Sequence, residues 1–270
     1  MNRIHILYYS ATGGTRKVLQ RLADLLSQRW SLPVVWNPYT TPADRNGFIP
    51  IQPDDFVIWG SPVYAGRLPN RLLPFLKEQL QGHDNPTLLL TTFGNRSFDN
   101  ALAEMHSLAL SHRLRPVAAA AIVLPHVFDN AIGKGRPTEE EWEALSHFAQ
   151  NIQPDGPTLL SLPGSAEAPY YQPLRHDLQP ANFLKALPEI DPSRCIRCHQ
   201  CEPLCPVGSI HSTETDITIE GICIKCGACL HRCPVQAISL THPDYQSHIR
   251  MLRENHSHPA PNAYFLPNLS

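Results

Sequence analysis

Eight cysteines, confined to two short runs, are the residues of this sequence whose type and spacing could do chemistry. The first run, CIRCHQCEPLCP, spans residues 195–206, and the second, CIKCGACLHRCP, spans residues 223–234. Both follow the spacing C-x2-C-x2-C-x3-C-P, and each cysteine of the first run lies 28 positions before its counterpart in the second. The two runs are therefore an internal duplication.

Three kinds of chemistry use closely spaced cysteines. A disulfide framework needs an oxidising compartment, but the sequence opens MNRIHILYYS, without the apolar stretch of a secretory signal. Zinc needs only four ligands and does not require this order of cysteines and proline. Three thiolates on a tight loop suit three irons of a [4Fe-4S] cluster, with the fourth cysteine pointing elsewhere. The spacing favours iron–sulfur chemistry, and zinc is the second interpretation.

The fourth cysteine of such a run ligates the other cluster in proteins with two clusters. This rule predicts two metal sites of four cysteines each, and because no ligand position is replaced we expect two four-iron clusters. One site is Cys195, Cys198, Cys201 and Cys233, and the other is Cys223, Cys226, Cys229 and Cys205. On these motifs, residues 189–242 resemble a bacterial two-cluster ferredoxin, a small α+β domain that would account for a fifth of the chain.

Composition narrows what the remaining residues can do. A length of 270 residues suggests about two domains, and 42% hydrophobic residues are enough for an ordinary core. The net charge of −2, without basic runs, gives no reason to expect nucleic acid or an anionic membrane as a partner. The longest apolar run, at residues 118–125, is too short to span a bilayer. We expect a soluble, cytoplasmic protein with reduced cysteines.

The first 150 residues alternate strand and helix signals, which is typical of a parallel sheet with helices on both faces. The apolar run RIHILYY predicts a buried strand, and TRKVLQRLADLLSQRW predicts an amphipathic helix. Further strands are expected at LPVVW, DFVIWG, TLLLTTF and PVAAAAIVL, with helices near 68–82, 98–112 and 138–152. Five strands in this rhythm suit the doubly wound α/β order 2-1-3-4-5, whose ligand site lies at the carboxyl ends of strands 1 and 3.

The loop after the first predicted strand reads SATGGT. It offers hydroxyls and small residues at the start of a helix, where converging N–H groups and the helix dipole favour an anion such as a phosphate. It contains neither G-x-G-x-x-G nor the G-K-[ST] of a nucleotide-hydrolysing P-loop. A Ser or Thr that caps the helix would explain the same residues, so both interpretations stay open.

Two more loops follow the third and fourth predicted strands. WGSPVYAGRLP and TFGNRSF each contain a glycine that allows close approach of a ligand, and each carries aromatic residues that could face a flat ring. Aromatic residues at strand ends also belong to ordinary cores. Three ligand-type loops at one edge of a sheet nevertheless indicate a binding site.

With S-x-T-G-x-T, G-S-P-V-Y and F-G-N-R in this order, the first part is similar to flavodoxin-like FMN-binding domains. The whole chain resembles the flavodoxin–ferredoxin fusion proteins of anaerobic microbes. The resemblance implies that Ser10, Ala11, Thr12, Gly13, Gly14 and Thr15 hold the FMN phosphate. It also implies that the flavin ring is lined by Ser61, Pro62, Val63, Tyr64, Ala65 and Gly66 and by Thr92, Phe93, Gly94, Asn95 and Arg96.

Four segments follow from these assignments. They are a flavodoxin-like FMN-binding domain at 1–155, a proline-rich connector at 156–188, a two-cluster ferredoxin-like domain at 189–242, and a C-terminal tail with a short helix at 243–270. The sequence does not indicate whether the connector packs against both domains or lets the second domain swing.

The expected function is electron transfer between redox partner proteins, because clusters carry single electrons and a flavin carries one or two. Covalent linkage raises the effective concentration of each group for the other. The alternative is an FMN-dependent reductase of a small molecule such as a quinone. Its only candidate proton donors are Tyr64, Arg96 and His126, which form no recognisable catalytic constellation, so no catalytic residue is assigned. The direction of electron flow and a homodimeric state stay open.

Overall fold

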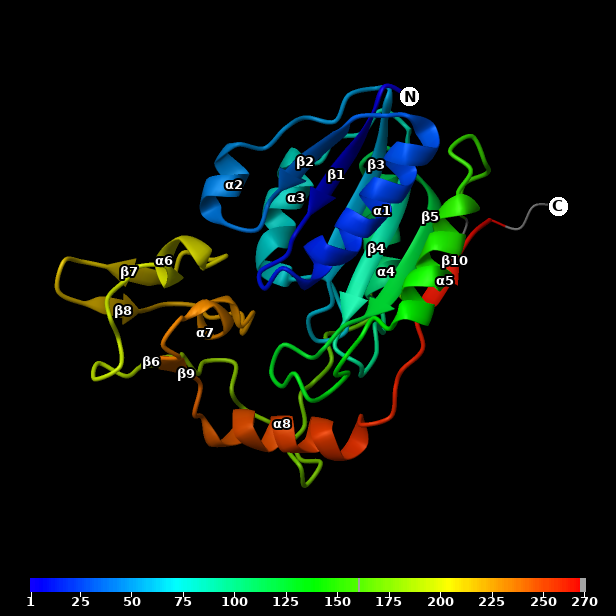
Figure 1. Cartoon of the computed structure of the whole chain (residues 1–270). Coiled ribbons are helices and arrows are strands. Elements are labelled where there is room, and N and C mark those ends of the chain that lie inside the picture. The colour runs from blue at the N-terminus through cyan, green and yellow to red at the C-terminus, as the bar shows by residue number, and fades with distance from the viewer. Residues whose placement is uncertain (160, 268–270) are drawn as a thin grey trace.

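The computed structural model describes residues 1–159 and 161–267 (Figure 1). A large sheet domain is formed by the first 150 residues, and the cysteine runs lie in a smaller part at the lower left of Figure 1. Helix α8, Pro243–Asn255, runs beneath both parts and leads the chain back to the sheet.

The main sheet contains five parallel strands, which are β1 Arg3–Tyr8, β2 Val34–Pro38, β3 Asp55–Pro62, β4 Asn85–Phe93 and β5 Leu114–Val123. Their spatial order, β5-β4-β3-β1-β2, is the predicted order 2-1-3-4-5. The prediction of a doubly wound, flavodoxin-like α/β fold is therefore confirmed, and the carboxyl ends of β1 and β3 lie side by side.

Helices cover both faces of this sheet, so its strands are almost continuously apolar. One face packs against α1, Gly14–Trp30, and α5, Glu139–Gln150. The other packs against α3, Leu73–Gln79, which follows a 3₁₀ turn at Asn70–Leu72, and against α4, Ala101–Ser111. The short α2, Pro42–Asn46, was not predicted, although Thr41 and Asp44 form a capping box around Pro42.

The sixth strand of the sheet comes from the C-terminal tail. Strand β10, Ala263–Phe265, pairs antiparallel with β5, with Tyr264 opposite Ala120. The side chain of Asn262 extends this edge by accepting a hydrogen bond from the backbone N–H of Val123 at 2.8 Å. The sequence predicted only the helix of this tail, because a three-residue strand between prolines carries almost no periodic signal.

The cysteine runs lie in a small α+β part, as predicted. Strand β6, Glu189–Ile190, pairs antiparallel with β9, Ile238–Ser239, and β7, Ile210–Ser212, pairs with β8, Ile217–Ile219. Helices α6, Cys201–Leu204, and α7, Ala228–Arg232, begin within one residue of equivalent positions in the two cysteine runs. The sequence duplication is thus also a structural one.

The connector packs against both parts of the molecule. Its Tyr171 N–H donates to the carbonyl oxygen of Ala65 at 2.8 Å, which holds it to the sheet domain. Farther along, Phe183 packs against Tyr245 of α8, with ring centroids 5.4 Å apart. Residue 160 of the connector and residues 268–270 of the tail lie outside the described residues.

No helix among residues 1–159 and 161–267 is long and apolar enough to cross a membrane.

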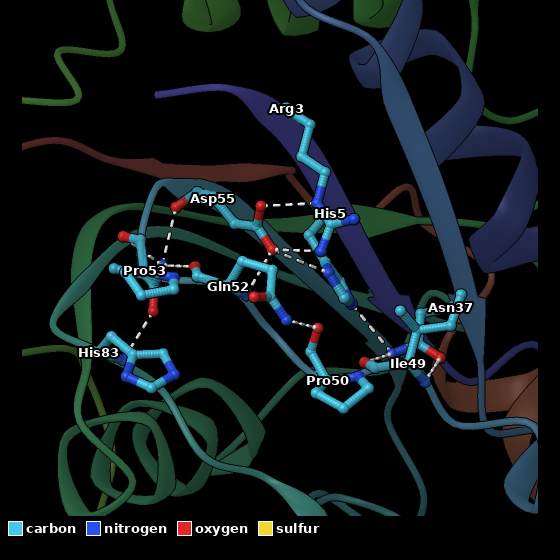
Figure 2. A network of polar contacts seen from close by, with 10 residues as sticks. Arg3, His5, Asn37, Ile49, Pro50, Gln52, Pro53, Asp55 and His83 are labelled. Carbon is cyan, nitrogen blue, oxygen red and sulfur yellow. Dashed lines mark hydrogen bonds and ion pairs between the residues drawn. The ribbon is translucent and has the colours of Figure 1, made fainter.

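A buried polar network fastens the amino ends of β1 and β3, at the edge of the sheet opposite to their carboxyl ends (Figure 2). Arg3 donates two hydrogen bonds to Asp55, at 2.7 and 3.0 Å, and the N–H of Gln52 donates a third at 2.8 Å. His5 lies 3.2 Å from the same carboxylate through Nδ1, while its Nε2 lies 2.9 Å from the amide nitrogen of Asn37. Nε2 is therefore the acceptor and Nδ1 the donor of a neutral ring.

Burial and hydrogen bonding set the protonation states of this network. Burial lowers the pKa of His5, in agreement with its neutral ring. Burial by itself would raise the pKa of Asp55, but the hydrogen bonds from Arg3 and Gln52 outweigh it and lower that pKa below the usual value. Both side chains therefore stabilise the fold above their unfolded pKa values, near 6.5 and 3.9, and lose that contribution as the pH falls through the lowered folded values.

We expect Asp55→Asn to lower the free energy of unfolding at pH 7 by about 2 kcal/mol, because it weakens charge-assisted hydrogen bonds and leaves buried donors poorly matched. The loss should shrink below about pH 4, where Asp55 begins to be protonated in the unfolded wild-type chain. Urea unfolding across pH measures it. Asp54→Asn, at the exposed neighbouring position, is the control. An equal loss in both variants, or a loss unchanged at low pH, would contradict this role of Asp55.

Candidate functional site

The structure brings the eight cysteines together in two groups of four. One cavity is lined by Cys205, Cys223, Cys226 and Cys229. A second cavity is lined by Cys195, Cys198, Cys201 and Cys233. Each group takes three cysteines from one run and the fourth from the other run, which is the arrangement that the cross-ligation rule predicts. We call the cavity with three thiols from the second run the second cysteine cavity, and the cavity with three thiols from the first run the first cysteine cavity.

The backbone around the two cavities is shaped alike. Arg197 and Lys225 have φ of 51° and 56°, and His199 and Gly227 have φ of 57° and 73°. These left-handed residues turn each loop tightly, so that successive N–H groups can face one centre. The N–H of Ser209 donates to Cys205 Sγ at 3.2 Å, and the N–H of Ala237, 28 positions later, donates to Cys233 Sγ at the same distance. Such N–H···S bonds stabilise the negative charge of sulfur ligands.

All eight cysteines are free thiols. Burial raises the pKa of the Cys226 and Cys229 thiols to about 12. A metal ion must therefore displace their protons, because the thiolate is the ligand form. Four cysteines that line one cavity, with N–H donors to Cys205 and to Cys233, fit a four-iron cluster in each half.

The second cysteine cavity lies against the sheet domain. Ile224 packs against the apolar layer of that domain, as Ala11, Val63 and Tyr64 also do. Its counterpart in the first run, Ile196, is 61% exposed. The same residue in the two halves of the duplication thus has opposite environments, and only the second half is docked through it.

Two tyrosines lie where the second cysteine run meets the sheet. Tyr9 directly follows β1 and Tyr64 follows β3, and their hydroxyls are 3.1 Å apart. Burial raises the pKa of both tyrosines well above the usual value. These two side chains are neutral, and Ile224, which lines the second cavity, packs against the same apolar layer as they do. The second cavity is therefore adjacent to the carboxyl ends of β1 and β3.

Further contacts fix this docking. His231 Nε2 lies 2.7 Å from the carbonyl oxygen of Val127, to which it donates, and Arg45 donates to the carbonyl oxygen of Pro206 at 2.9 Å. A Cβ added to Gly227 would lie 2.7 Å from Val127, so a glycine is needed at this contact.

The loop at residues 10–15 is built for an anion at the start of α1. Gly13, with φ of 91°, occupies the N-cap and supplies no side-chain cap. The first turn contains no acidic residue, whereas Arg16 and Lys17 place two cations where the helix dipole is unfavourable to them. A bound phosphate would accept hydrogen bonds from the free N–H groups and would balance the positive charge of these two side chains. Ser10 caps one N–H, that of Arg16, at 3.0 Å, so capping explains only part of the loop.

Hydroxyl contacts hold this loop to neighbouring strands. The N–H of Ser10 donates to Thr40 Oγ1 at 2.9 Å. Thr15 Oγ1 lies 2.8 Å from Thr92 Oγ1, and both side chains are buried. The structure thus joins the 10–15 loop to the start of the 92–96 loop, as expected from strand order.

The turn at residues 61–66 is tight and faces the second cysteine run. Ala65 and Gly66 have φ of 47° and 78°, and Tyr64 and Arg67 exchange backbone hydrogen bonds across them. A Cβ on Gly66 would overlap Asp99, at 2.4 Å from its carboxylate oxygen. Ser61 is buried at the end of β3.

The polar side chains at residues 92–96 bind protein groups. The Asn95 amide donates to the carbonyl oxygens of His256 and His258, at 2.7 and 2.9 Å, and so anchors the tail before β10. Arg96 forms an ion pair with Asp99 and lies over the ring of Tyr171, 3.9 Å from its centroid. The Asn95 and Arg96 side chains are thus already engaged by protein groups.

Arg232 is a site residue that the sequence did not single out. Its Nη2 would lie 3.5 Å from a Cβ at Gly13, and it lines one cavity together with Arg16, Lys17 and Arg21 of α1. Arg232 also lines the first cysteine cavity. The ferredoxin-like part thus contributes a cation at the predicted phosphate loop. The sequence contained one signal for this residue, because Arg232 stands in the second run at the position that Leu204 occupies in the first.

None of the three candidate proton donors is poised to act at neutral pH. Burial lowers the pKa of His126 to about 4, so its ring is neutral, and its Nδ1 accepts the N–H of Phe128 at 3.1 Å. Tyr64 holds its proton strongly. Arg96 is engaged by Asp99 and Tyr171.

Comparison with protein families supports the iron–sulfur assignment. Residues 188–211 and 217–239 match the 4Fe-4S binding domain family, one match for each cysteine run. The prediction of two [4Fe-4S] clusters is therefore confirmed. No curated protein matches the chain.

Solved structures that align with about half of the chain include three flavodoxins. A flavodoxin from the domain Archaea is 10% identical with a TM-score of 0.38, covering 54% of this chain and 93% of its own. Flavodoxin 2 from Bacillus cereus is 18% identical with a TM-score of 0.41, covering 55% and 95%. A Streptococcus pneumonia TIGR4 flavodoxin is 20% identical with a TM-score of 0.37, covering 54% and 94%. At these TM-scores the likeness carries no argument about function.

The strand order and the family match together define the class of protein. The chain joins a flavodoxin-like α/β domain to a ferredoxin domain with two 4Fe-4S motifs.

We expect cysteine substitutions to fall into two groups that cross the sequence runs. Cys205→Ala should abolish the same cluster as Cys226→Ala, and Cys233→Ala the same cluster as Cys198→Ala, because each cavity takes its fourth thiol from the other run. Iron content and EPR spectra of the reduced variants measure this. If Cys205→Ala instead matches Cys198→Ala, the cross-ligation is refuted.

Proposed function

We propose that this chain is an electron carrier that holds two [4Fe-4S] clusters and one FMN and exchanges electrons with redox partner proteins. The observation that carries the proposal is the seating of the second cysteine run on the carboxyl edge of the sheet, where Ile224 of that run packs against the apolar layer that holds Tyr9 and Tyr64. In doubly wound sheets of this order that edge is the ligand site.

The clusters supply one-electron chemistry, and FMN supplies one- or two-electron chemistry. We assign the clusters to the two cysteine cavities and the FMN phosphate to residues 10–15. The ring is assigned to the edge formed by residues 61–66 and 92–96. The proposed segments are 1–155 for flavin, 156–188 as connector, 189–242 for the clusters and 243–270 as a tail. The tail takes part in the flavin domain, because β10 belongs to its sheet.

The way in which the two parts are docked sets the order of the redox groups along the proposed path of the electrons. Ile224 and the two tyrosines exclude water between the second cavity and the sheet edge, which lowers the local dielectric around the transfer path. The first cavity has the exposed Ile196 beside it and is open to an external partner. We therefore place the entry or exit for partner proteins at the first cavity.

A reductase of a small molecule is the weaker candidate. Such an enzyme needs a positioned acid near neutral pKa. The neutral His126, the strongly protonated Tyr64 and the paired Arg96 do not supply one. Eight cysteines grouped as cluster ligands, none of them in a disulfide, suit a reducing compartment, so we propose the cytoplasm as the place of action.

Anaerobic purification followed by iron, sulfide and flavin analysis tests this proposal. It requires iron and sulfide for two clusters and one bound FMN for each chain, and addition of dithionite should bleach both the flavin and the cluster absorption. Loaded clusters without any FMN affinity would overturn the flavin assignment, and loaded FMN with zinc in the cysteine cavities would overturn the electron relay.

We expect Arg232→Gln to weaken FMN binding about tenfold, because it removes a cation from the predicted phosphate loop, and a charge-assisted hydrogen bond contributes about 1.5–3 kcal/mol. Titration of the flavin-free protein with FMN and with riboflavin measures the change in affinity. Riboflavin lacks the phosphate, so its affinity should not change. Equal weakening of both ligands would mean that Arg232 acts only by docking the two parts, and Arg232→Lys should retain most of the FMN affinity.

A further inference from the structure

The two cysteine runs carry a basic residue at the same position but place it differently. The first run has Arg197 in C-I-R-C, and the second has Lys225 in C-I-K-C, 28 positions later. Their backbones match, with φ of 51° and 56°. Arg197 is exposed, whereas Lys225 is only 8% exposed. Of the two equivalent cations, the one in the second run is therefore buried and the one in the first run is exposed.

Lys225 lies in the wall of the second cysteine cavity. Its ammonium donates to the carbonyl oxygen of Cys223 at 2.9 Å and to that of Leu184, in the connector, at 2.5 Å. Both partners are neutral backbone groups, so neither cancels the positive charge with a carboxylate. A lysine is rarely buried in this way, because its charge is costly to remove from water.

A cation in this position acts on a cluster through its charge. Each electron added to a cluster makes the cluster more negative, and a nearby ammonium at low dielectric stabilises the reduced state. The first cavity has Arg232 in its wall, but Arg197 and Arg232 are both exposed, so water and salt screen their charges and their effect is much smaller. The two cavities therefore present different electrostatic environments to clusters of the same type.

We propose that Lys225 raises the reduction potential of the cluster in the second cavity above that of the cluster in the first, so that electrons collect beside Tyr9 and Tyr64. The inference rests on the proposed function, because it needs both clusters. In the step that it favours, the first cluster loses one electron and the second gains it, and no atom is transferred.

Lys225 also ties the connector to the second run through Leu184, so an experiment must separate charge from structure. Lys225→Gln removes the charge but keeps an amide N–H that can donate to a carbonyl. Lys225→Arg keeps the charge. Lys225→Met removes both charge and donor. Arg197→Met is the matched control, because it removes the equivalent cation from the other run.

The measurement is an anaerobic potentiometric titration of each full-length variant, followed by EPR, after iron analysis has established that both clusters are loaded. We expect Lys225→Gln and Lys225→Met to lower the potential of one cluster only, changing the equilibrium constant for electron exchange between the clusters about tenfold, which is 59 mV for one electron. Lys225→Arg should stay near the wild type, and Arg197→Met should shift neither potential by a comparable amount.

Three results would overturn the inference. They are unchanged potentials in loaded Lys225→Gln, an equal shift of both clusters, and a shift in Arg197→Met as large as in Lys225→Gln. If the first of these results is accompanied by a lowered potential in Lys225→Met, the residue has a structural role rather than an electrostatic one. A wild-type protein that cannot hold two clusters would instead overturn the proposed function, so the two failures are distinguishable.

Discussion

The contact between the second cysteine run and the carboxyl ends of β1 and β3 is the constraint on which the account of this protein depends. Ile224 packs against the apolar layer of the sheet domain, to which Tyr9 and Tyr64 with their paired hydroxyls also belong. Backbone geometry permits the approach, because Gly227 leaves room for Val127. Without this contact the ferredoxin part would be an independent carrier on a tether. With this contact, the second cysteine cavity has a fixed position against the sheet domain.

Two segments keep the two parts in place, the connector and the return through α8 to β10. The connector hydrogen-bonds to the 64–67 turn and packs its Phe183 against α8. Helix α8 leads the chain to β10, which pairs with β5, so the sheet domain is completed by residues from beyond the ferredoxin part. Asn95 fastens this return through the carbonyl oxygens of His256 and His258. Rotation of the ferredoxin part would therefore strain both the connector and the return segment.

Much of this organisation was predictable from the sequence, because it rests on local patterns. Alternating strand and helix signals gave the strand order, and the duplicated cysteine spacing gave two four-cysteine groups that the structure brings to two cavities. The short β10 and the docked face of the ferredoxin part depend on long-range contacts, which periodicity does not report. One signal was nevertheless present: the second run has Gly227, His231 and Arg232 where the first has His199, Pro203 and Leu204. Those differences lie where the second run contacts the sheet domain.

The rate of electron transfer between cluster and flavin, measured by flash reduction of the loaded protein over a range of concentrations, tests the central claim most directly. A docked second cavity predicts a first-order rate that does not change with protein concentration. A rate that rises in proportion to concentration would mean that electrons pass between different chains, and it would contradict the contact at Tyr9 and Tyr64 as the route.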